Sequence, residues 1–173
     1  MPTTKRAAPD ACTLLDSDHR KVKKMFTDYE ALAKSRSSQA GARKLELAKQ
    51  ICLELSVHAR IEEEIFYPAL RDAIKQTDLL DEAEVEHSTA KDLIAQLEGA
   101  ADADEMFDAK VKVLGEYIDH HVKEEESELF PQARRAKMDL VALGEELDQR
   151  KMELLEDLGV IDSVEEEEET AAR

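Results

Sequence analysis

Four long stretches of the chain place apolar residues at alternating steps of three and four, which is the repeat of one face of an α-helix. They run from about residue 10 to 34, 42 to 74, 77 to 98 and 104 to 136. The polar segment SRSSQAG separates the first two, and GAADAD separates the last two. Four helices of this length joined by short loops predict an all-α fold, an antiparallel up-and-down four-helix bundle.

A weaker amphipathic segment, DLVALGEELDQRKMELLEDLG, follows these four. It predicts an additional C-terminal helix outside the bundle, interrupted at Gly144 or starting after it, because glycine weakens a helix interior. The run EEEEETAAR is a like-charge segment of the kind that stays solvated. The predicted organisation is an N-terminal arm (1–10), the bundle (11–136), a C-terminal helical extension (137–160) and a disordered acidic tail (161–173).

The charge balance restricts the classes of partner. The chain has 41 acidic and 24 basic residues and a net charge of −17 at neutral pH. Such a surface repels nucleic acid and anionic membranes, so neither is an expected partner. The N-terminus has a basic pair without a following apolar run, and no segment reaches the length of a membrane span. We therefore expect a cytoplasmic protein, either a monomer or a homodimer.

The two cysteines, Cys12 and Cys52, are too few and too far apart in sequence for a zinc-binding motif. On antiparallel helices they are expected to lie roughly 20 Å apart, which excludes a disulfide between them. We predict two free thiols, buried or half-buried on helices, without a function.

One motif occurs twice. The segments HARIEEEIFYP and HVKEEESELFP begin at His58 and His121. Counted from the histidine, both contain Glu at +4 and +5, an apolar residue at +8, an aromatic residue at +9 and a closing proline at +10. In a helix, residues four apart stand one turn apart on the same face, so His58 pairs with Glu62 and His121 with Glu125. The closing prolines lack an N–H group and predict a kink or an early helix end.

A lone histidine that follows an acidic residue precedes each copy. His19 stands 39 residues before His58, and His87 stands 34 residues before His121. The chain therefore consists of two helical hairpins of one kind, and each brings one lone histidine and one His-x3-Glu pair to its inner face.

Six potential metal ligands thus fall on apolar stripes: His19, His58, Glu62, His87, His121 and Glu125. Left bare in one core they would be strongly destabilising. Neutral imidazole and carboxylate are ligands of first-row transition metals, and six are too many for one structural zinc ion. They predict two metal ions bridged by the two glutamates. The alternative is a wet core in which nearby glutamates satisfy the histidines without metal.

Three further residues lie near this predicted site. His120 points about 100° away from the stripe, so we expect it to be exposed or to support the ligands from outside. Glu63 and Glu126 recur one position off the ligand face. They are expected to be solvated or to accept hydrogen bonds from ligand imidazoles.

The order of these motifs resembles the hemerythrin-like (HHE cation-binding) family over about residues 11 to 135. The resemblance implies an up-and-down four-helix bundle around a non-haem di-iron centre, bridged by two carboxylates and an oxo or hydroxo group. It also implies that the six residues named above are the ligands. The donor types alone do not distinguish Fe from Mn or Zn.

One position departs from the oxygen-carrying members, which have a further histidine four residues after the equivalent of His87. This chain has Lys91 there, and an ammonium group cannot ligate. We therefore expect one histidine fewer and an open position, which favours binding of a small oxidant over reversible oxygen carriage. The resemblance implies a small diatomic or peroxide ligand (O2, peroxide or NO) with catalase-like or ferroxidase-like turnover. Iron, oxygen or redox sensing and iron storage without turnover remain the alternatives.

Among the tyrosines, Tyr117 lies one turn before His121 and is the candidate for a catalytic phenol that faces the site. A core position is the alternative for Tyr117. Tyr29 and Tyr67 are predicted to be structural.

Overall fold

The computed structural model describes residues 9–161, and within this range the predicted all-α fold is confirmed. The predicted N-terminal arm and acidic tail lie almost wholly outside the described residues. The elements are α1 (Ala11–Ala33), α2 (Ala40–Ile61), α3 (Tyr67–Ala73), α4 (Asp78–Glu98), α5 (Glu105–Glu124), α6 (Phe130–Arg135) and α7 (Leu140–Asp157), with π-helical turns η1 (Glu62–Phe66) and η2 (Glu125–Leu129). Across residues 9–161, no helix is both long and apolar enough to cross a bilayer.

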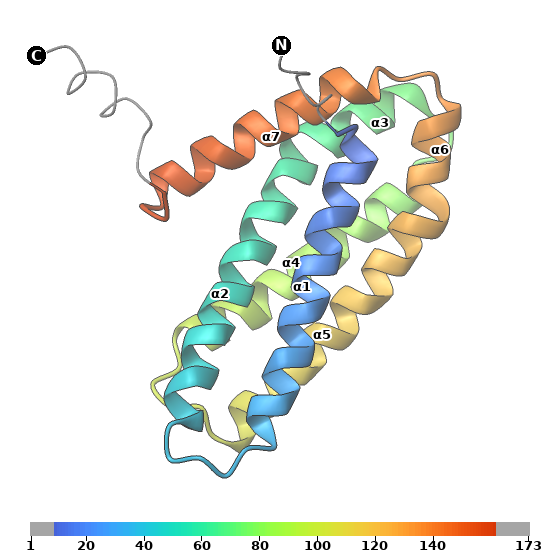
Figure 1. Cartoon of the computed structure of the whole chain (residues 1–173). Coiled ribbons are helices and arrows are strands. Elements are labelled where there is room, and N and C mark those ends of the chain that lie inside the picture. The colour runs from blue at the N-terminus through green and yellow to red at the C-terminus, as the bar shows by residue number, and fades with distance from the viewer. Residues whose placement is uncertain (1–8, 162–173) are drawn as a thin grey trace, which may run out of the picture.

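Four long helical segments lie side by side (Figure 1). The chain runs along α1, returns along α2, η1 and α3, runs back along α4, and returns along α5, η2 and α6. Contacts join α1 to α2, α2 to α4, α4 to α5 and α5 to α1, so the four segments enclose a common core. The helix α7 lies across one end of this bundle, where it contacts α1, α2 and η1.

Aspartate side chains begin three of these helices. Asp10 accepts a hydrogen bond from the backbone N–H of Thr13 at 2.8 Å. Asp104 does the same for Phe107 at 2.8 Å, and Asp139 accepts from the N–H of Ala142 at 3.0 Å. Each carboxylate satisfies a backbone donor that the first helical turn leaves unpaired, which explains why α1, α5 and α7 begin where they do.

The kinks predicted at the prolines take the form of π-helical turns. The N–H of Tyr67 donates to the carbonyl of Glu62, and the N–H of Phe130 donates to that of Glu125, so each bond spans five residues. Pro68 then stands in the first turn of α3, where its missing N–H is least costly. Because a π-helical turn contains an extra residue, every side chain after it is rotated relative to a regular helix.

This rotation corrects the predicted core stripe. A regular helix would place Ile65 and Ala69 on the same face as His58 and Glu62, but both are only half-buried. Phe66 and Leu70 are fully buried in their place, and Tyr67 is 1% exposed. The extra residue of η1 therefore turns Tyr67, which we expected to be structural, toward the middle of the bundle.

The apolar core has two parts, one on each side of a buried polar layer. The part next to α7 includes Cys12 and Phe66, and the part toward the far loops includes Cys52 and Leu114. Both cysteines are free and buried, as predicted. The polar layer between the two parts contains the histidines and glutamates of the repeated motif.

The prediction that Gly144 interrupts the C-terminal helix is wrong. α7 begins at Leu140 and continues through Gly144. A Cβ atom on this glycine would lie 2.5 Å from the carbonyl oxygen of Pro9 and 2.9 Å from the backbone N of Ala11. The glycine therefore lets the start of α1 pack directly against α7. The sequence of either helix alone does not indicate this contact.

Gly144→Ala is expected to lower the free energy of unfolding by about 1 to 3 kcal/mol, because backbone atoms must move to admit the methyl group. Thermal unfolding measures the change. Gly41, in the first turn of α2, is the matched control, since a Cβ atom there meets nothing within 4 Å. Gly41→Ala should leave stability unchanged or raise it by up to about 1 kcal/mol. Equal melting temperatures for the two variants would contradict the close packing at Gly144.

Candidate metal centre

The structure brings the six predicted metal ligands together. They lie in the polar layer between the two parts of the core, and all are buried. Glu62 is 0% exposed and Glu125 is 1% exposed, although both are carboxylates. The contributing elements are α1, α2, η1, α4, α5 and η2, so every long segment of the bundle supplies at least one group.

The first hairpin forms one half of this cluster. The Nε2 atoms of His19 and His58 lie 3.1 Å apart. Oε1 of Glu62 lies 2.9 Å from His58 Nε2, and Oε2 of Glu125 lies 3.1 Å from His19 Nε2. These four side chains therefore converge on one small volume, in which a single ion could contact all of them.

The second hairpin forms the other half. The Nε2 atoms of His87 and His121 lie 3.0 Å apart. Oε2 of Glu62 lies 3.3 Å from His87 Nε2, and Oε2 of Glu125 lies 3.6 Å from His121 Nε2. Each glutamate thus lies between the two histidine pairs, as a bridging carboxylate requires.

The outer nitrogens of two of these imidazoles contact an acid from their own hairpin. His58 Nδ1 lies 3.2 Å from Asp18, and His121 Nδ1 lies 2.6 Å from Glu86. Both acids directly precede the lone histidine of their hairpin. Sequence reasoning noted this recurrence but assigned the acids no role, because the pairing joins neighbouring helices and not neighbouring residues.

The other two outer nitrogens contact an acid from the opposite hairpin. Glu63 lies 2.9 Å from His87 Nδ1, and Glu126 lies 3.1 Å from His19 Nδ1. Of the two roles expected for these glutamates, the structure favours acceptance of imidazole hydrogen bonds. With all four Nδ1–H groups directed at carboxylates, the Nε2 lone pairs are left facing the centre, which is the arrangement that metal-binding histidines need.

Residues 10–133 of the chain match the family model described as the hemerythrin HHE cation binding domain. The chain belongs to the hemerythrin HHE family. All six clustered groups lie within this cation-binding domain.

One solved structure and one curated protein are similar to this hemerythrin HHE chain. A solved hemerythrin HHE cation-binding domain-containing protein from Mycobacterium kansasii superposes with a TM-score of 0.66 at 24% identity, covering 84% of this chain and 87% of that one. A protein named DNA nickase from Nostoc sp. (strain PCC 7120 / SAG 25.82 / UTEX 2576) is 32% identical over 117 residues, or 68% of this chain. The chain matches only 31% of the nickase's length.

The residues of this HHE domain fit metal ions. Oε1 of Glu62 and Oε2 of Glu125 are buried and accept no hydrogen bond from any part of the chain that the structure describes. Each nevertheless lies within 3.1 Å of an imidazole Nε2. Lone pairs held this close repel one another unless a cation or a proton lies between them. The orphaned carboxylate oxygens are therefore the atoms that a metal ion would satisfy.

Without metal, protons must take this position. Burial disfavours the charged form of His58, but the Glu62 carboxylate and the hydrogen bond with Asp18 outweigh burial and raise its pKa to about 10. Burial also opposes the charged form of His87, yet hydrogen bonds with Glu62 and Glu63 raise its pKa to about 9. Burial raises the pKa of the Glu62 carboxyl group, but His58 and His87 outweigh burial and hold this pKa well below 4.5.

Metal binding is expected to release about two protons per chain at pH 7, because a cation that takes Nε2 of His58 and His87 must displace theirs. Both pKa values, about 10 and about 9, lie above 7, so these protons are present in the metal-free protein. Apparent affinity should accordingly rise with pH and level off above these values. Titration with Mn²⁺ or Zn²⁺ in weakly buffered solution, followed with a pH-stat, measures the release. Binding without proton release would contradict the assignment of these nitrogens.

The stability of the metal-free protein should change with pH in the opposite direction to metal affinity: it should fall as pH rises. Its two raised histidine pKa values contribute stability that is fully present below the unfolded value of about 6.5 and is lost as pH rises through 9 to 10. Denaturant unfolding of metal-free and loaded protein at pH 6.5 and pH 9.5 compares the two forms.

The tyrosine at this centre is Tyr67, and the prediction for Tyr117 is wrong. The Tyr67 hydroxyl donates to Glu125 Oε1 at 2.6 Å and lies 3.4 Å from both His87 Nε2 and His121 Nε2. Tyr117 is 43% exposed, whereas Leu114 and His121 of the same helix are buried. Sequence reasoning missed Tyr67 because a regular helix would have pointed it elsewhere.

The two halves of the centre differ at this position. Phe130 occupies the place of Tyr67 in the second copy of the motif. Its ring stacks on that of His19, with centroids 5.8 Å apart and an interplanar angle of 2°. The half with His87 and His121 therefore has a hydroxyl group, whereas the half with His19 has a hydrocarbon face.

Lys91 does not contact the centre directly. Its Nζ donates to both carboxylate oxygens of Glu63 at 2.7 Å, and its side chain is 50% exposed. Since Glu63 in turn accepts from His87 Nδ1, Lys91 supports a ligand from outside. His120 is 64% exposed and contacts Glu124 at 3.3 Å, which agrees with its expected position off the ligand stripe.

A small cavity of about 30 Å³ adjoins all four imidazoles. Apolar side chains form most of its remaining wall: Val22, Leu55, Ala59, Ala90, Ile94, Ile118 and Val122. A volume of roughly 10 to 15 Å³ holds one water molecule on this measure, so the cavity has room for about two atoms of that size. This cavity therefore has room for a diatomic molecule or a peroxide and is too small for an organic substrate.

Proposed function

We propose that the chain holds two iron ions at the six buried groups and binds a small oxidant beside them: O2, hydrogen peroxide or NO. The observation that carries the proposal is the 30 Å³ apolar cavity next to four imidazoles. Sites for drug-sized organic molecules are about ten times larger or more. The cavity thus matches a ligand of two atoms or a peroxide, and the donor set matches a redox metal.

In this proposal Glu62 and Glu125 would help to hold both ions, since each carboxylate lies between the histidine pairs. His19 and His58 would hold one ion, and His87 and His121 the other. Iron fits four nitrogen and two carboxylate donors without cysteine, and Mn or Zn shares these ligands. When bound, iron would supply a redox-active Lewis acid at the cavity.

The chain's own residues would then orient the reaction. The four carboxylates at Nδ1 hold the imidazole rings, and the apolar wall limits the amount of water beside them. Tyr67 places a hydroxyl group where it can donate a hydrogen bond to an oxygen atom at the centre. Burial and the nearby Glu125 and Glu62 carboxylates raise its pKa well above 10, so the phenol keeps its proton at neutral pH.

The activity proposed for such a site is catalase-like decomposition of hydrogen peroxide, in which two molecules of peroxide give one of oxygen and two of water. Protein expressed with iron should contain about two iron ions per chain and show a visible absorption band that changes with peroxide. An oxygen electrode measures the gas evolved, and His58→Ala should abolish it. Purified protein without bound metal would sink the proposal.

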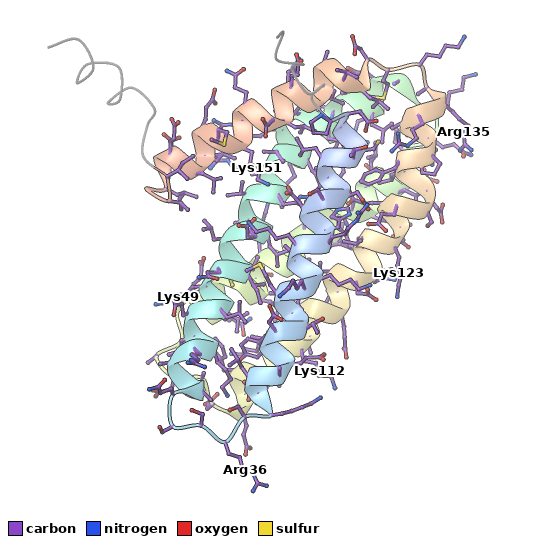
Figure 2. The ribbon with its side chains drawn as sticks, viewed as in Figure 1. Arg36, Lys49, Lys112, Lys123, Arg135 and Lys151 are labelled. Carbon is purple, nitrogen blue, oxygen red and sulfur yellow. The ribbon has the colours of Figure 1, made fainter. Side chains whose placement is uncertain are left out.

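A sensing role without turnover is the second candidate, because α7 is connected to the centre. Lys151, which Figure 2 labels on α7, contacts Asp18 at 2.5 Å, and Asp18 holds His58 Nδ1. A change in metal state at His58 could alter this contact and the docking of α7. Amide exchange of α7 can be measured with and without iron. A difference between the two states, in protein that evolves no oxygen, would favour this role. DNA cleavage is not proposed, since the match spans 31% of the nickase and the net charge is −17.

A further inference from the structure

A second and much larger concavity reaches the centre from outside. It is a groove of about 790 Å³ between α1 and α5, and its far end lies near Tyr29 and Lys34. Lys112 and Lys123, labelled along α5 in Figure 2, belong to its lining. A groove of this size could hold an organic molecule, in contrast to the inner cavity.

Three residues line both the groove and the inner cavity: His19, Ile118 and Val122. His19 is held at both ring nitrogens, by Glu126 on one side and by the cluster on the other. Ile118 and Val122 are half-buried, stand one turn apart on α5, and have only rotatable hydrocarbon side chains. The movable part of the wall between the two spaces is therefore these two residues.

We propose that Ile118 and Val122 determine which molecules reach the centre, by closing the passage from the α1–α5 groove to the inner cavity. Molecules the size of O2, NO or hydrogen peroxide pass when the two side chains rotate, a motion that takes picoseconds to nanoseconds for accessible side chains. Bulkier organic peroxides stay in the groove. This inference rests on the proposed function, since it assigns the entry route to the same site.

An ion pair lies on the opposite side of the inner cavity. Ser56, Ala59 and Lys91 line it between α2 and α4. Lys91 is tied to Glu63 by two 2.7 Å contacts, and Glu63 is tied to His87. Entry on that side would require the ion pair between Lys91 and Glu63 to break, although Glu63 holds His87. Entry from the groove requires only the rotation of hydrocarbon side chains.

Azide binding to iron-loaded protein, followed by stopped-flow absorbance, tests the passage. Val122→Ala should raise the association and dissociation rate constants together by about tenfold, because a smaller wall residue lowers the barrier that both steps cross. Val122 also lines the inner cavity, so Kd should change, but much less than the two rate constants. Ile118→Ala should do the same, and Val122→Phe should slow both steps. Val122 is half-buried, so its replacement by alanine is the variant least damaging to the fold.

Ile94→Ala is the matched control, because Ile94 lines the inner cavity but not the groove. It deletes the same atoms as Ile118→Ala and should alter Kd without accelerating both steps equally. If Ile94→Ala and Ile118→Ala give the same kinetics, the passage is not at Ile118. Wild-type protein that holds iron but shows no spectral change with azide would contradict an open coordination position at the metal. The proposed entry route would then be contradicted as well.

Size selectivity gives a second measure. The spectrum of the wild-type protein should change much faster with hydrogen peroxide than with tert-butyl hydroperoxide. Val122→Ala should lower the ratio of these two rates about tenfold. An unchanged ratio in both Val122→Ala and Ile118→Ala, in protein that reacts with hydrogen peroxide, would overturn the assignment while leaving the proposed function intact.

Discussion

Replacing Glu62 with alanine is expected to remove most of the bound metal. The Glu62 carboxylate lies between His58 and His87, at 2.9 Å and 3.3 Å, so both proposed ions lose a ligand and a compensating charge. Metal analysis after dialysis should fall from about two ions per chain to less than one, with affinity lower by more than about 100-fold. Glu125 would then be the one carboxylate of the six groups left to compensate the charge of both ions.

The two glutamates that follow in sequence are the controls for this experiment. Glu63→Ala should keep the metal stoichiometry but weaken affinity about 10- to 100-fold, because Glu63 holds His87 Nδ1 from outside. Glu64→Ala should leave metal binding unchanged, since Glu64 is an exposed residue paired with Arg60 and Arg150. If Glu62→Ala and Glu64→Ala retained the same metal content, Glu62 would not be a ligand.

Tyr67→Phe is expected to leave the fold and the metal content intact while slowing the reaction with peroxide by about 100-fold or more. The substitution removes one hydroxyl group, which donates to Glu125 Oε1 at 2.6 Å and faces the second histidine pair. Its loss leaves the centre without the Tyr67 proton donor and Glu125 without a partner at that oxygen. Iron analysis and the rate of the spectral change with peroxide separate the two effects.

Tyr117→Phe is the matched control, because it deletes the same atom from a side chain that is 43% exposed. It should react like the wild type. The reciprocal Phe130→Tyr places a phenol beside His19, where the wild type has a stacked hydrocarbon ring. Peroxide kinetics of Tyr67→Phe equal to those of Tyr117→Phe would show that the buried hydroxyl has only a packing role.

Much of the candidate site could be predicted from local spacing. A histidine and a glutamate four residues apart must share a helix face, so His58 and Glu62 were predictable as a pair wherever the helix was placed. The internal repeat then predicted His121 and Glu125, and the structure brings all four together. The all-α fold was predictable for the same reason, since periodicity is a property of the chain alone.

The contacts made between helices could not be predicted in this way. Which acid holds which imidazole depends on how two hairpins cross, and Glu126 reaches His19 across 107 positions of sequence. The close approach of α7 at Gly144 likewise depends on where the start of α1 lies. Local patterns indicate the inward face of a helix but not its neighbour.

By itself, the sequence determined the helices, the six buried groups and the chemistry that they share, because these follow from residue type and a repeat of 3.6. The tertiary structure alone decided which tyrosine meets that chemistry. Two π-helical turns, each with one extra residue, rotate the following side chains, so Tyr67 faces the centre and Phe130 stacks on His19. The size of the inner cavity and its wall of Ile118 and Val122 likewise exist only once four helices meet.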